Sequence, residues 1–272
     1  MPELPEVETL VLQLRKAIKP CRITKVEIRN AGLLNLPARQ FQKTLTSKKI
    51  LQISRRGKYI RFQLSGKFTL WLHLGMTGQL FLEDPSWPLK PHTHLILSFK
   101  HFSRQLFYRD VRRFGRIFLT SDPQNQLPEG VRRLGPEPRE WKSEAFISFL
   151  KKRQARIKSL LLDQKIVAGL GNIYADESLH RAGIHPLRRP YQIPRTRLGR
   201  LHTNMCEVLE EAIARGGSST SDYLHLNSRP GSFQKFHRVY GRKGKSCLAC
   251  SSLIRTVRIS GRTSSFCPQC QQ

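Results

Sequence analysis

The chain opens with the sequence MPELPE, which places residues capable of covalent chemistry at the N-terminus. Removal of Met1 would leave Pro2 with a free secondary amine, and amines are covalent catalysts toward carbonyl carbons. An α-amino group has a pKa of about 8, so a useful fraction is neutral at physiological pH. Its adduct with a sugar C1′ would be an iminium that cannot lose a proton from nitrogen and therefore favours elimination. Glu3 and Glu6 are close enough in sequence to move the protons.

The same residues also suit the start of a helix. Pro5 is a good first helical residue, and Glu6 and Glu8 suit the positive end of a helix dipole. The opening sequence alone does not distinguish a covalent centre from an ordinary helix start. Residues at the other end of the chain are needed to distinguish them.

Four cysteines near the end of the chain form two Cys-x-x-Cys pairs, Cys247 with Cys250 and Cys267 with Cys270. This spacing is typical of a zinc site in which each pair makes a tight turn and points two sulfurs at one ion. Two disulfides are the alternative, but they require an oxidising compartment that nothing in the sequence indicates. Because all four ligands come from the protein, we expect one structural Zn²⁺ without an open coordination position.

The net charge of the chain indicates which class of partner it binds. The chain has 48 Lys and Arg against 19 Asp and Glu, a net charge of +29, which would repel itself strongly without a polyanionic partner. Nucleic acid and an anionic membrane surface are the two candidates. No apolar run approaches the roughly 18 residues that span a bilayer, and the basic residues do not gather on one amphipathic helix. Nucleic acid is therefore favoured.

The basic residues are concentrated toward the end of the chain. Residues 223–272 contain no Asp or Glu, whereas nine Lys and Arg fall there. If these side chains served only to keep the segment in solution, positive and negative charges would be mixed. We interpret this segment as phosphate-facing.

The N-terminal half has the periodicity of one helix followed by short strands. A helix is expected from Pro5 to about Ile18, because apolar residues recur there at helical spacing. In residues 59–64 apolar and polar side chains alternate, as in a half-buried strand. Six further runs are expected to be strands: Ile23–Arg29, Ile50–Ser54, Phe68–Leu74, His94–Phe99, Gln105–Tyr108 and Arg116–Thr120. Short strands at this spacing predict an antiparallel sandwich or barrel.

The pattern changes after Ser121, where residues 121–139 hold four prolines and few apolar side chains, which indicates a linker. Beyond it we expect helices over Ser143–Arg153, Ile157–Gln164, Ile173–Ala182 and Thr196–Arg215, and a zinc hairpin whose first strand is Leu253–Ile259. The predicted domains are a catalytic β-sandwich over 1–130, a linker over 131–142, a helical domain over 143–232 and a zinc finger over 233–272.

Taken together, the two ends of the chain resemble one family, the formamidopyrimidine-DNA glycosylases of bacterial base-excision repair. The resemblance covers essentially the whole chain and is carried by the four cysteines and by Met1–Thr9, Arg56–Tyr59, His73–Gly78, Asp110–Gly115, Ala168–Glu177 and Val239–Gly244. It implies an α+β protein of two domains. The N-terminal domain would be an antiparallel β-sandwich flanked by helices, and the C-terminal domain would carry a helix-two-turn-helix element and a β-hairpin zinc finger.

The resemblance also implies a reaction. The protein would be a bifunctional DNA glycosylase and AP lyase that removes oxidised purines, 8-oxoguanine and formamidopyrimidines. Pro2 would attack C1′ and form a Schiff base, and β,δ-elimination would follow. Glu3 would move protons at the sugar, Glu6 would support that centre, and Lys58 is counted with them as catalytic.

The damaged base would leave the duplex, and other side chains would fill its place. Met76, Arg112 and Phe114 match the filling residues of the family, as a flexible apolar side chain, a guanidinium that pairs with the orphaned base and an aromatic wedge. A core position is the alternative for Phe114, but its place just before Gly115 and after two arginines is awkward for a core residue.

Lys58, His73, Asn172 and Arg262 match the phosphate clamp of the family, and Lys158 matches a position at the DNA surface. For Lys58 the alternative is a solvated turn lysine, and for His73 a structural histidine. Asn172 heads a predicted helix, whose N-terminal amides would attract an anion; an ordinary helix cap is compatible with that role. Arg262 lies five residues before Cys267, so zinc would position this arginine.

Residues Gly217–Arg229 would form a mobile lid over the flipped base, with Ser218, Ser219, Thr220 and Tyr223 facing the lesion. Damaged double-stranded DNA would lie between the two domains. We expect no membrane partner, a monomer, and a cytoplasmic protein that is associated with the bacterial nucleoid when bound to DNA.

Two alternatives stay open. The sister enzyme for oxidised pyrimidines would differ in its preferred lesion, although Leu4, Met76 and the lid resemble the purine enzyme. A non-catalytic zinc-finger protein on the same scaffold would bind DNA without forming a covalent adduct.

Overall fold

The computed structural model describes residues 1–18, 20–121 and 126–272. These form two compact units: unit 1 comprises Met1–Arg132 and Arg215–Ser232, and unit 2 comprises Arg133–Ala214 and Phe233–Gln272. The division differs from the predicted boundaries in two places. The lid segment, assigned to the helical domain, groups with unit 1, and the helical domain and zinc finger share unit 2.

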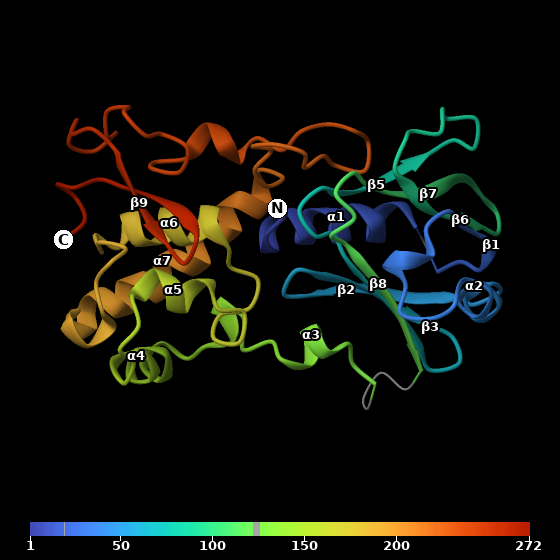
Figure 1. Ribbon diagram of the computed structural model, residues 1–272, viewed down its shortest axis with the longest axis horizontal. Coiled ribbons are helices and arrows are strands. Elements are labelled where there is room, and N and C mark those ends of the chain that lie inside the picture. Colours follow the sequence, from blue (N-terminus) through green and yellow to red (C-terminus); the bar gives the residue numbers. More distant parts are fainter. Residues whose placement is uncertain (19, 122–125) are drawn as a thin grey trace. The chain divides into compact units, whose positions relative to one another are not determined.

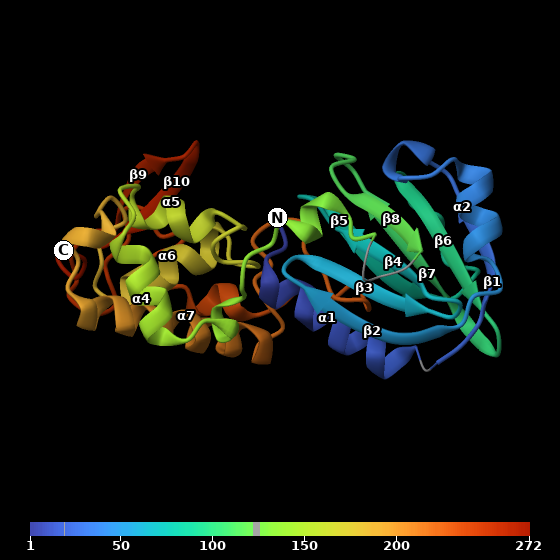
Figure 2. The same ribbon diagram turned by 90° about the horizontal axis from the view of Figure 1, so that it is seen from below.

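Unit 1 is a β-sandwich, which confirms the predicted fold class. Its helices are α1 (Leu4–Ala17), α2 (Ala38–Leu45) and α3 (Glu129–Arg132), and its strands are β1 (Ile23–Ile28), β2 (Ile50–Arg56), β3 (Tyr59–Leu64), β4 (Phe68–His73), β5 (Gly78–Glu83), β6 (Thr93–Phe99), β7 (Phe102–Asp110) and β8 (Arg116–Ser121). They form two four-stranded antiparallel sheets, in the orders β1-β6-β7-β5 and β2-β3-β4-β8 (Figures 1 and 2).

Side chains of both sheets and of α1 pack together in one apolar core of unit 1. In β3 the buried and partly exposed residues alternate along the strand, as the sequence predicts, and Ile60 and Phe62 face Leu72 and Leu70 of β4. Leu10 and Leu14 of α1 are fully buried in the same core. Burial of these apolar side chains fixes the direction of α1 and therefore the position of the chain terminus.

Three elements of unit 1 were not predicted: β5, α2 and α3, the last a helix of only four residues. In β5 all residues from Gly78 to Leu82 are buried, so the strand lacks alternation. The reason is a second apolar layer on its outer face, where Phe81 packs with Trp87 and Leu224. Helix α2 is only 8 residues long and buries Phe41 and Leu45, which is too short a pattern to distinguish from a loop.

Unit 2 contains the helices α4 (Ser143–Lys151), α5 (Ile157–Leu162), α6 (Asn172–Arg181) and α7 (Arg195–Ala214) and the hairpin strands β9 (Arg255–Ile259) and β10 (Arg262–Phe266) (Figure 2). The predicted helix bounds differ from these by at most two residues. Two successive turns join α5 to α6, and Gln164 holds them by accepting a hydrogen bond from the Gly169 amide and donating to the Leu170 carbonyl. This is the predicted helix-two-turn-helix element.

The predicted linker is only partly described, since residues 122–125 lie outside the described residues. Its later part packs on unit 2: the Gly135 amide donates to Gln164 O at 2.9 Å, and the Trp141 indole donates to Ile166 O at 3.1 Å. Throughout the described ranges of the chain, no helix is both long and apolar enough to cross a membrane.

Candidate functional site

Pro2 and Glu3 are buried immediately before α1, and Glu6 lies in its first turn. Glu3 and Glu6 form a capping box: the Glu3 backbone amide donates to Glu6 Oε2 at 2.8 Å, and the Glu3 carboxyl accepts from the backbone amide of Glu6. The two residues are 3% and 1% exposed. The capping box fixes both carboxyl groups at the positive end of the helix dipole. The structure thus brings together the three predicted residues of the N-terminal centre.

The lid segment contacts the same centre. The Ser218 amide donates to Glu6 Oε1 at 2.7 Å, and the Tyr223 hydroxyl donates to the Glu6 carbonyl at 3.3 Å. Gly217 has φ +77°, and a Cβ there would lie 2.8 Å from Glu6 Oε1, so only glycine allows this approach. Burial and the Glu6 charge raise the pKa of Tyr223, which stays a protonated donor. Glu6 therefore joins the N-terminal centre to the lid.

The four predicted lid residues differ in exposure. Ser218 and Tyr223 are buried, Ser219 is partly exposed and Thr220 is exposed. Ser219 Oγ donates to Tyr223 O at 2.7 Å and accepts from the Gly231 amide at 2.9 Å, which closes the segment on itself. The two buried residues are thus anchors of the lid, whereas Thr220 is accessible at its surface.

Met76, Arg112 and Phe114 lie together at the surface of unit 1. An Arg112 guanidinium N–H contacts Met76 Sδ at 3.3 Å, and the guanidinium lies 4.6 Å from the centre of the Phe114 ring. Met76 is 39% and Phe114 51% exposed, which excludes a core role for Phe114. A thioether, a cation and a ring in mutual contact form a protruding amphipathic group, as a wedge between bases requires.

Buried Asp110 holds the loops that carry Met76, Arg112 and Phe114. Its carboxylate accepts hydrogen bonds from the Thr77 hydroxyl and from the Gly115 amide at 2.7 Å, and Thr77 Oγ1 accepts the Arg112 amide at 3.0 Å. Gly75 has φ +62°, and a Cβ there would lie 2.6 Å from backbone atoms of the facing loop. The two loops therefore touch through their backbones. The sequence analysis did not predict this role of Asp110, although Asp110 is the first residue of Asp110–Gly115, one of the segments that carry the family resemblance.

Lys58 lies in the turn between β2 and β3, next to Tyr59, which pairs with His73 at the end of β4. Lys58 is buried, which excludes a solvated turn lysine. His73 Nδ1 accepts the Gly75 amide at 3.2 Å, so the proton of the neutral ring is on Nε2. Burial, together with the positive charges of Lys58 and Arg116, lowers the pKa of His73 to about 4. At neutral pH this histidine is an uncharged N–H donor, and such a donor can bind a phosphate oxygen.

Acid should destabilise unit 1 through His73. The folded-state pKa is about 4 and the unfolded one about 6.5, so between these values the unfolded chain binds more protons. The stabilisation is complete above pH 6.5 and falls as pH drops toward 4. His73→Gln should reduce the loss of unfolding free energy between pH 7 and 4.5 by about 2 kcal/mol, measured by urea unfolding at both pH values. An unchanged pH dependence in the variant would contradict the assignment.

In unit 2 the structure brings Asn172 and Arg262 close together. Gly171 is the N-cap of α6 and Asn172 is its first residue, so Asn172 is not the helix cap. Its Nδ2 donates to Thr263 O at 2.9 Å, next to the exposed Arg262 at the start of β10. The amides at the start of α6 and the arginine of the hairpin therefore lie on adjoining elements, as a phosphate site requires.

The side chain of Lys158, which was predicted to lie at the DNA surface, points into unit 2 in this structure. Lys158 is fully buried, and its Nζ is 2.5 Å from Asp176 Oδ1 in an ion pair between α5 and α6. Asp176 Oδ2 also accepts the Ser265 amide of β10 at 2.9 Å. A charge surrounded by protein is stable only when paired, and this pairing directs Lys158 inward. Its role is to join α5, α6 and the hairpin.

Breaking this pair should be costly for unit 2. Lys158→Met leaves Asp176 buried without its ammonium partner, and removal of one member of a buried pair costs about 3–5 kcal/mol. We expect that loss in the free energy of unfolding, measured by denaturant titration. Asp176→Asn in the same chain should restore part of it, because the uncompensated charge is gone. A single-variant loss below about 1 kcal/mol would show that the pair does not stabilise the unit.

Glu177 is a second buried carboxylate that was not assigned a role. Its oxygens accept three successive backbone amides, those of Arg238, Val239 and Tyr240, at 2.8–3.0 Å. Together with Asp176 it fixes both ends of the zinc finger to α6. The sequence feature that could have indicated this role is the adjacent pair Asp176 and Glu177, because acidic residues are few in this chain.

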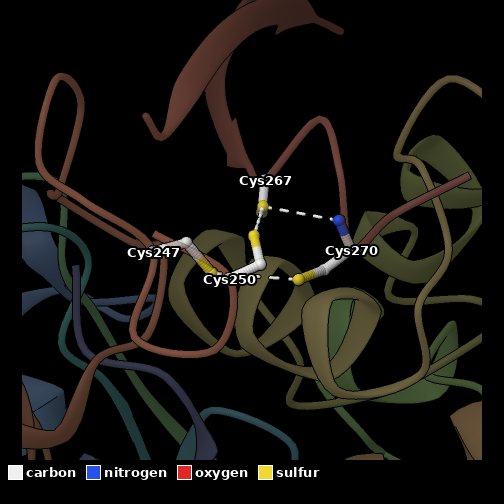
Figure 3. Close-up of side chains that lie close together, drawn as sticks. All are labelled: Cys247, Cys250, Cys267 and Cys270. Atoms are coloured by element: carbon white, nitrogen blue, oxygen red, sulfur yellow. Dashed lines mark hydrogen bonds between the residues drawn. The ribbon is translucent and has the colours of Figure 1, made fainter. Parts of the chain in front are cut away.

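The four predicted zinc ligands form one cluster (Figure 3). Their sulfurs all lie within 4.8 Å of one another, with Cys247 3.9 Å from Cys270 and Cys250 3.4 Å from Cys267. Tetrahedral zinc with bonds of about 2.3 Å requires sulfurs about 3.8 Å apart. All four cysteines are free, which excludes the disulfide alternative. The donor set therefore fits one structural Zn²⁺, which would tie the two knuckles together.

The two units define a class of protein. Unit 1 is a β-sandwich with a buried Pro-Glu segment at its start and an exposed cluster of Met76, Arg112 and Phe114. Unit 2 joins a helix-two-turn-helix element to a four-cysteine zinc finger. A strongly basic chain with these parts is a zinc-finger protein that binds nucleic acid.

Comparison with known proteins identifies the family. The chain matches the formamidopyrimidine-DNA glycosylase N-terminal domain over residues 1–117, the H2TH domain of the same family over 134–223, and the zinc finger found in FPG and IleRS over 244–272. It is 46% identical to a formamidopyrimidine-DNA glycosylase of Solibacter usitatus, with 100% of both chains covered. The chain therefore belongs to the formamidopyrimidine-DNA glycosylase family.

Solved structures agree over the whole length. A Lactococcus lactis FPG mutant in complex with DNA containing Fapy-dG has a TM-score of 0.93 at 40% identity, with 100% of each chain covered. The wild-type Lactococcus lactis FPG in complex with DNA containing an oxidised pyrimidine has a TM-score of 0.92 at 39% identity, again with full coverage.

Proposed function

We propose that this protein is a base-excision DNA glycosylase and AP lyase that removes oxidised purines from damaged duplex DNA. One observation carries the proposal: Pro2 is buried and directly precedes Glu3 and Glu6, whose carboxyl groups a capping box fixes in place. Membership in the formamidopyrimidine-DNA glycosylase family supports the same assignment.

The first step is extrusion of the damaged base, which costs a few kcal/mol of lost stacking. Met76 and Phe114 would enter the vacated space, and Arg112 would donate hydrogen bonds to the orphaned base. These side chains are exposed and in mutual contact, so the wedge needs no rearrangement of the core. The lid, held at Glu6 through Ser218 and Tyr223, would cover the extruded base.

The second step is covalent. After removal of Met1, the Pro2 nitrogen would attack C1′ as the glycosidic bond breaks and the base leaves with its electron pair. Ring opening gives an iminium between Pro2 and the sugar, and loss of a C2′ proton expels the 3′ phosphate. A second elimination expels the 5′ phosphate. Glu3 is the group placed to carry protons at the sugar, and Glu6 holds the Glu3 backbone.

Phosphate contacts would hold the duplex during both steps. Lys58 and the Nε2–H of His73 would serve this purpose in unit 1, and Asn172 with Arg262 in unit 2. The exposed basic residues of 223–272 would add non-specific attraction. Damaged double-stranded DNA is thus the proposed partner. We also propose that the protein acts as a monomer and that it is cytoplasmic and nucleoid-associated, where thiolates stay reduced.

Borohydride trapping tests the proposal. With an 8-oxoguanine duplex, reduction of the iminium should give a stable protein–DNA adduct whose linked peptide begins at Pro2, as identified by mass spectrometry. Thr203→Ala, a change at an exposed position of α7 to which no role is assigned, serves as a control variant that should still form the adduct. Binding without any adduct would favour the non-catalytic alternative.

Oxidised pyrimidines are a second candidate substrate class. The observation in its favour is the relative from Lactococcus lactis in complex with oxidised-pyrimidine DNA. Single-turnover excision of 8-oxoguanine opposite cytosine and of thymine glycol, measured side by side, would rank the two classes. We expect the purine lesion to be excised faster.

A further inference from the structure

His180 lies in the last turn of α6 and faces the zinc cluster from outside the finger. Its Nε2 is 3.8 Å from Cys247 Sγ, and both residues are buried. We infer that His180 is a positioning residue of the zinc site, which donates a hydrogen bond from Nε2–H to the Cys247 thiolate. No role for a side chain of α6 at the metal follows from the cysteine motif.

The direction of the bond follows from the chemistry of the sulfur. A cysteine that binds zinc does so as a thiolate, and a thiolate has no hydrogen to donate. The imidazole nitrogen that faces it must therefore carry the hydrogen. The other ring nitrogen, Nδ1, is buried without a hydrogen-bond partner, so no competing acceptor in the described chain directs the ring elsewhere.

Charge explains why the bond matters. Four thiolates around one Zn²⁺ carry a formal charge of −2, which buried surroundings disfavour. Two backbone amides offset part of it: Ala249 N donates to Cys247 Sγ at 3.5 Å and Cys270 N to Cys267 Sγ at 3.4 Å. His180 is a side-chain donor that acts from a different element. Arg197, Arg200 and Arg238 line a cavity of about 360 Å³ beside His180, and their positive charges favour the same anionic cluster.

The bond also couples metal loading to the DNA-facing part of unit 2. Helix α6 begins at Asn172, whose side chain binds Thr263, and contacts the Ser265 amide through Asp176. His180 adds a contact at the opposite end of the same helix. Zinc, α6 and the hairpin that carries Arg262 are therefore joined through one helix, and loss of the His180 donor should loosen the metal.

Metal spectroscopy separates this role from simple packing. His180→Phe keeps a ring and removes the donor, whereas His180→Gln keeps an N–H near the Nε2 position. We expect His180→Phe to release Zn²⁺ to a chromophoric chelator about tenfold faster, the lower end of the effect of outer-shell partners on metal sites. In the Co²⁺-loaded variant the thiolate-to-metal charge-transfer band should shift to lower energy, and His180→Gln should reverse both changes.

The matched control is His202→Phe. His202 is a partly buried histidine of α7 in the same unit, and its Nε2 bonds to the Pro138 carbonyl. This variant should leave the zinc release rate and the Co²⁺ spectrum unchanged. A wild-type spectrum and release rate in His180→Phe would overturn the inference.

A measurement on the unmodified chain covers the case in which His180→Phe fails to fold. In the ¹¹³Cd-loaded protein, a scalar coupling between the metal and the His180 Hε2 proton would travel through the N–H···S bond. Its detection supports the inference. A His180 ring with its proton on Nδ1 would contradict it.

Discussion

A chain that retains any residue ahead of Pro2 is expected to bind damaged duplex but not to cleave it. In such a chain the Pro2 nitrogen is an amide, whose lone pair is delocalised and cannot attack C1′. Loss of a covalent nucleophile costs on the order of 10³-fold or more in rate. Single-turnover cleavage of an 8-oxoguanine duplex should fall by at least that factor, while the Kd measured by fluorescence anisotropy changes less than threefold.

Two matched controls make this result specific. The same extension placed after Gln272 should leave cleavage unchanged. Pro5→Ala alters a second buried proline of the same segment, one that has no free amine, and should reduce cleavage only a few-fold. Full activity in a preparation whose amino terminus is shown by mass spectrometry to be extended would refute the proposed mechanism.

Disruption of the zinc site is expected to weaken DNA binding far more than it changes the chemistry of bound DNA. The zinc cluster lies in unit 2 and has no member in the N-terminal centre. Cys267→Ser should release the hairpin on which Arg262 is mounted and raise the Kd at least about tenfold, since a charge-assisted phosphate contact contributes about 1.5–3 kcal/mol. The fraction of bound DNA that is trapped by borohydride should stay within twofold.

Cys206→Ser is the control for this experiment. Cys206 is a partly buried free cysteine of α7 outside the cluster, so its replacement should leave the Kd unchanged. An unaltered affinity in Cys267→Ser, with zinc shown to be absent, would remove the proposed role of Arg262.

Periodicity in the sequence was enough to predict most of the architecture. The alternation in β3 and the apolar stripe of α1 are local patterns, because a half-buried strand or helix repeats along its own length. The spacing of Cys247, Cys250, Cys267 and Cys270 predicted a metal cluster for the same reason, since each knuckle is a local turn. β5 escaped prediction because both of its faces are covered, one of them by Trp87 and Leu224 from distant segments.

The functional site shows the same division between features that local sequence predicts and features that depend on distant segments. Residue types indicated Pro2, Glu3 and Glu6 as a chemical centre, and the family resemblance implied a wedge that includes Arg112 and Phe114. The sequence did not predict that Ser218 of the lid would bind Glu6, more than two hundred residues earlier in the chain. Nor did it predict that Lys158 would turn inward to Asp176.

The sequence by itself determined most of the elements, the metal ligands and the family, because each is encoded in local spacing or in residue types. Tertiary structure decided which side chains are accessible and which are anchors. That distinction depends on burial and on partners from remote segments, as the inward Lys158, the Glu6 link to the lid and the His180 contact with Cys247 show. A desolvated charge or polar group must find a partner, and only the folded chain supplies one.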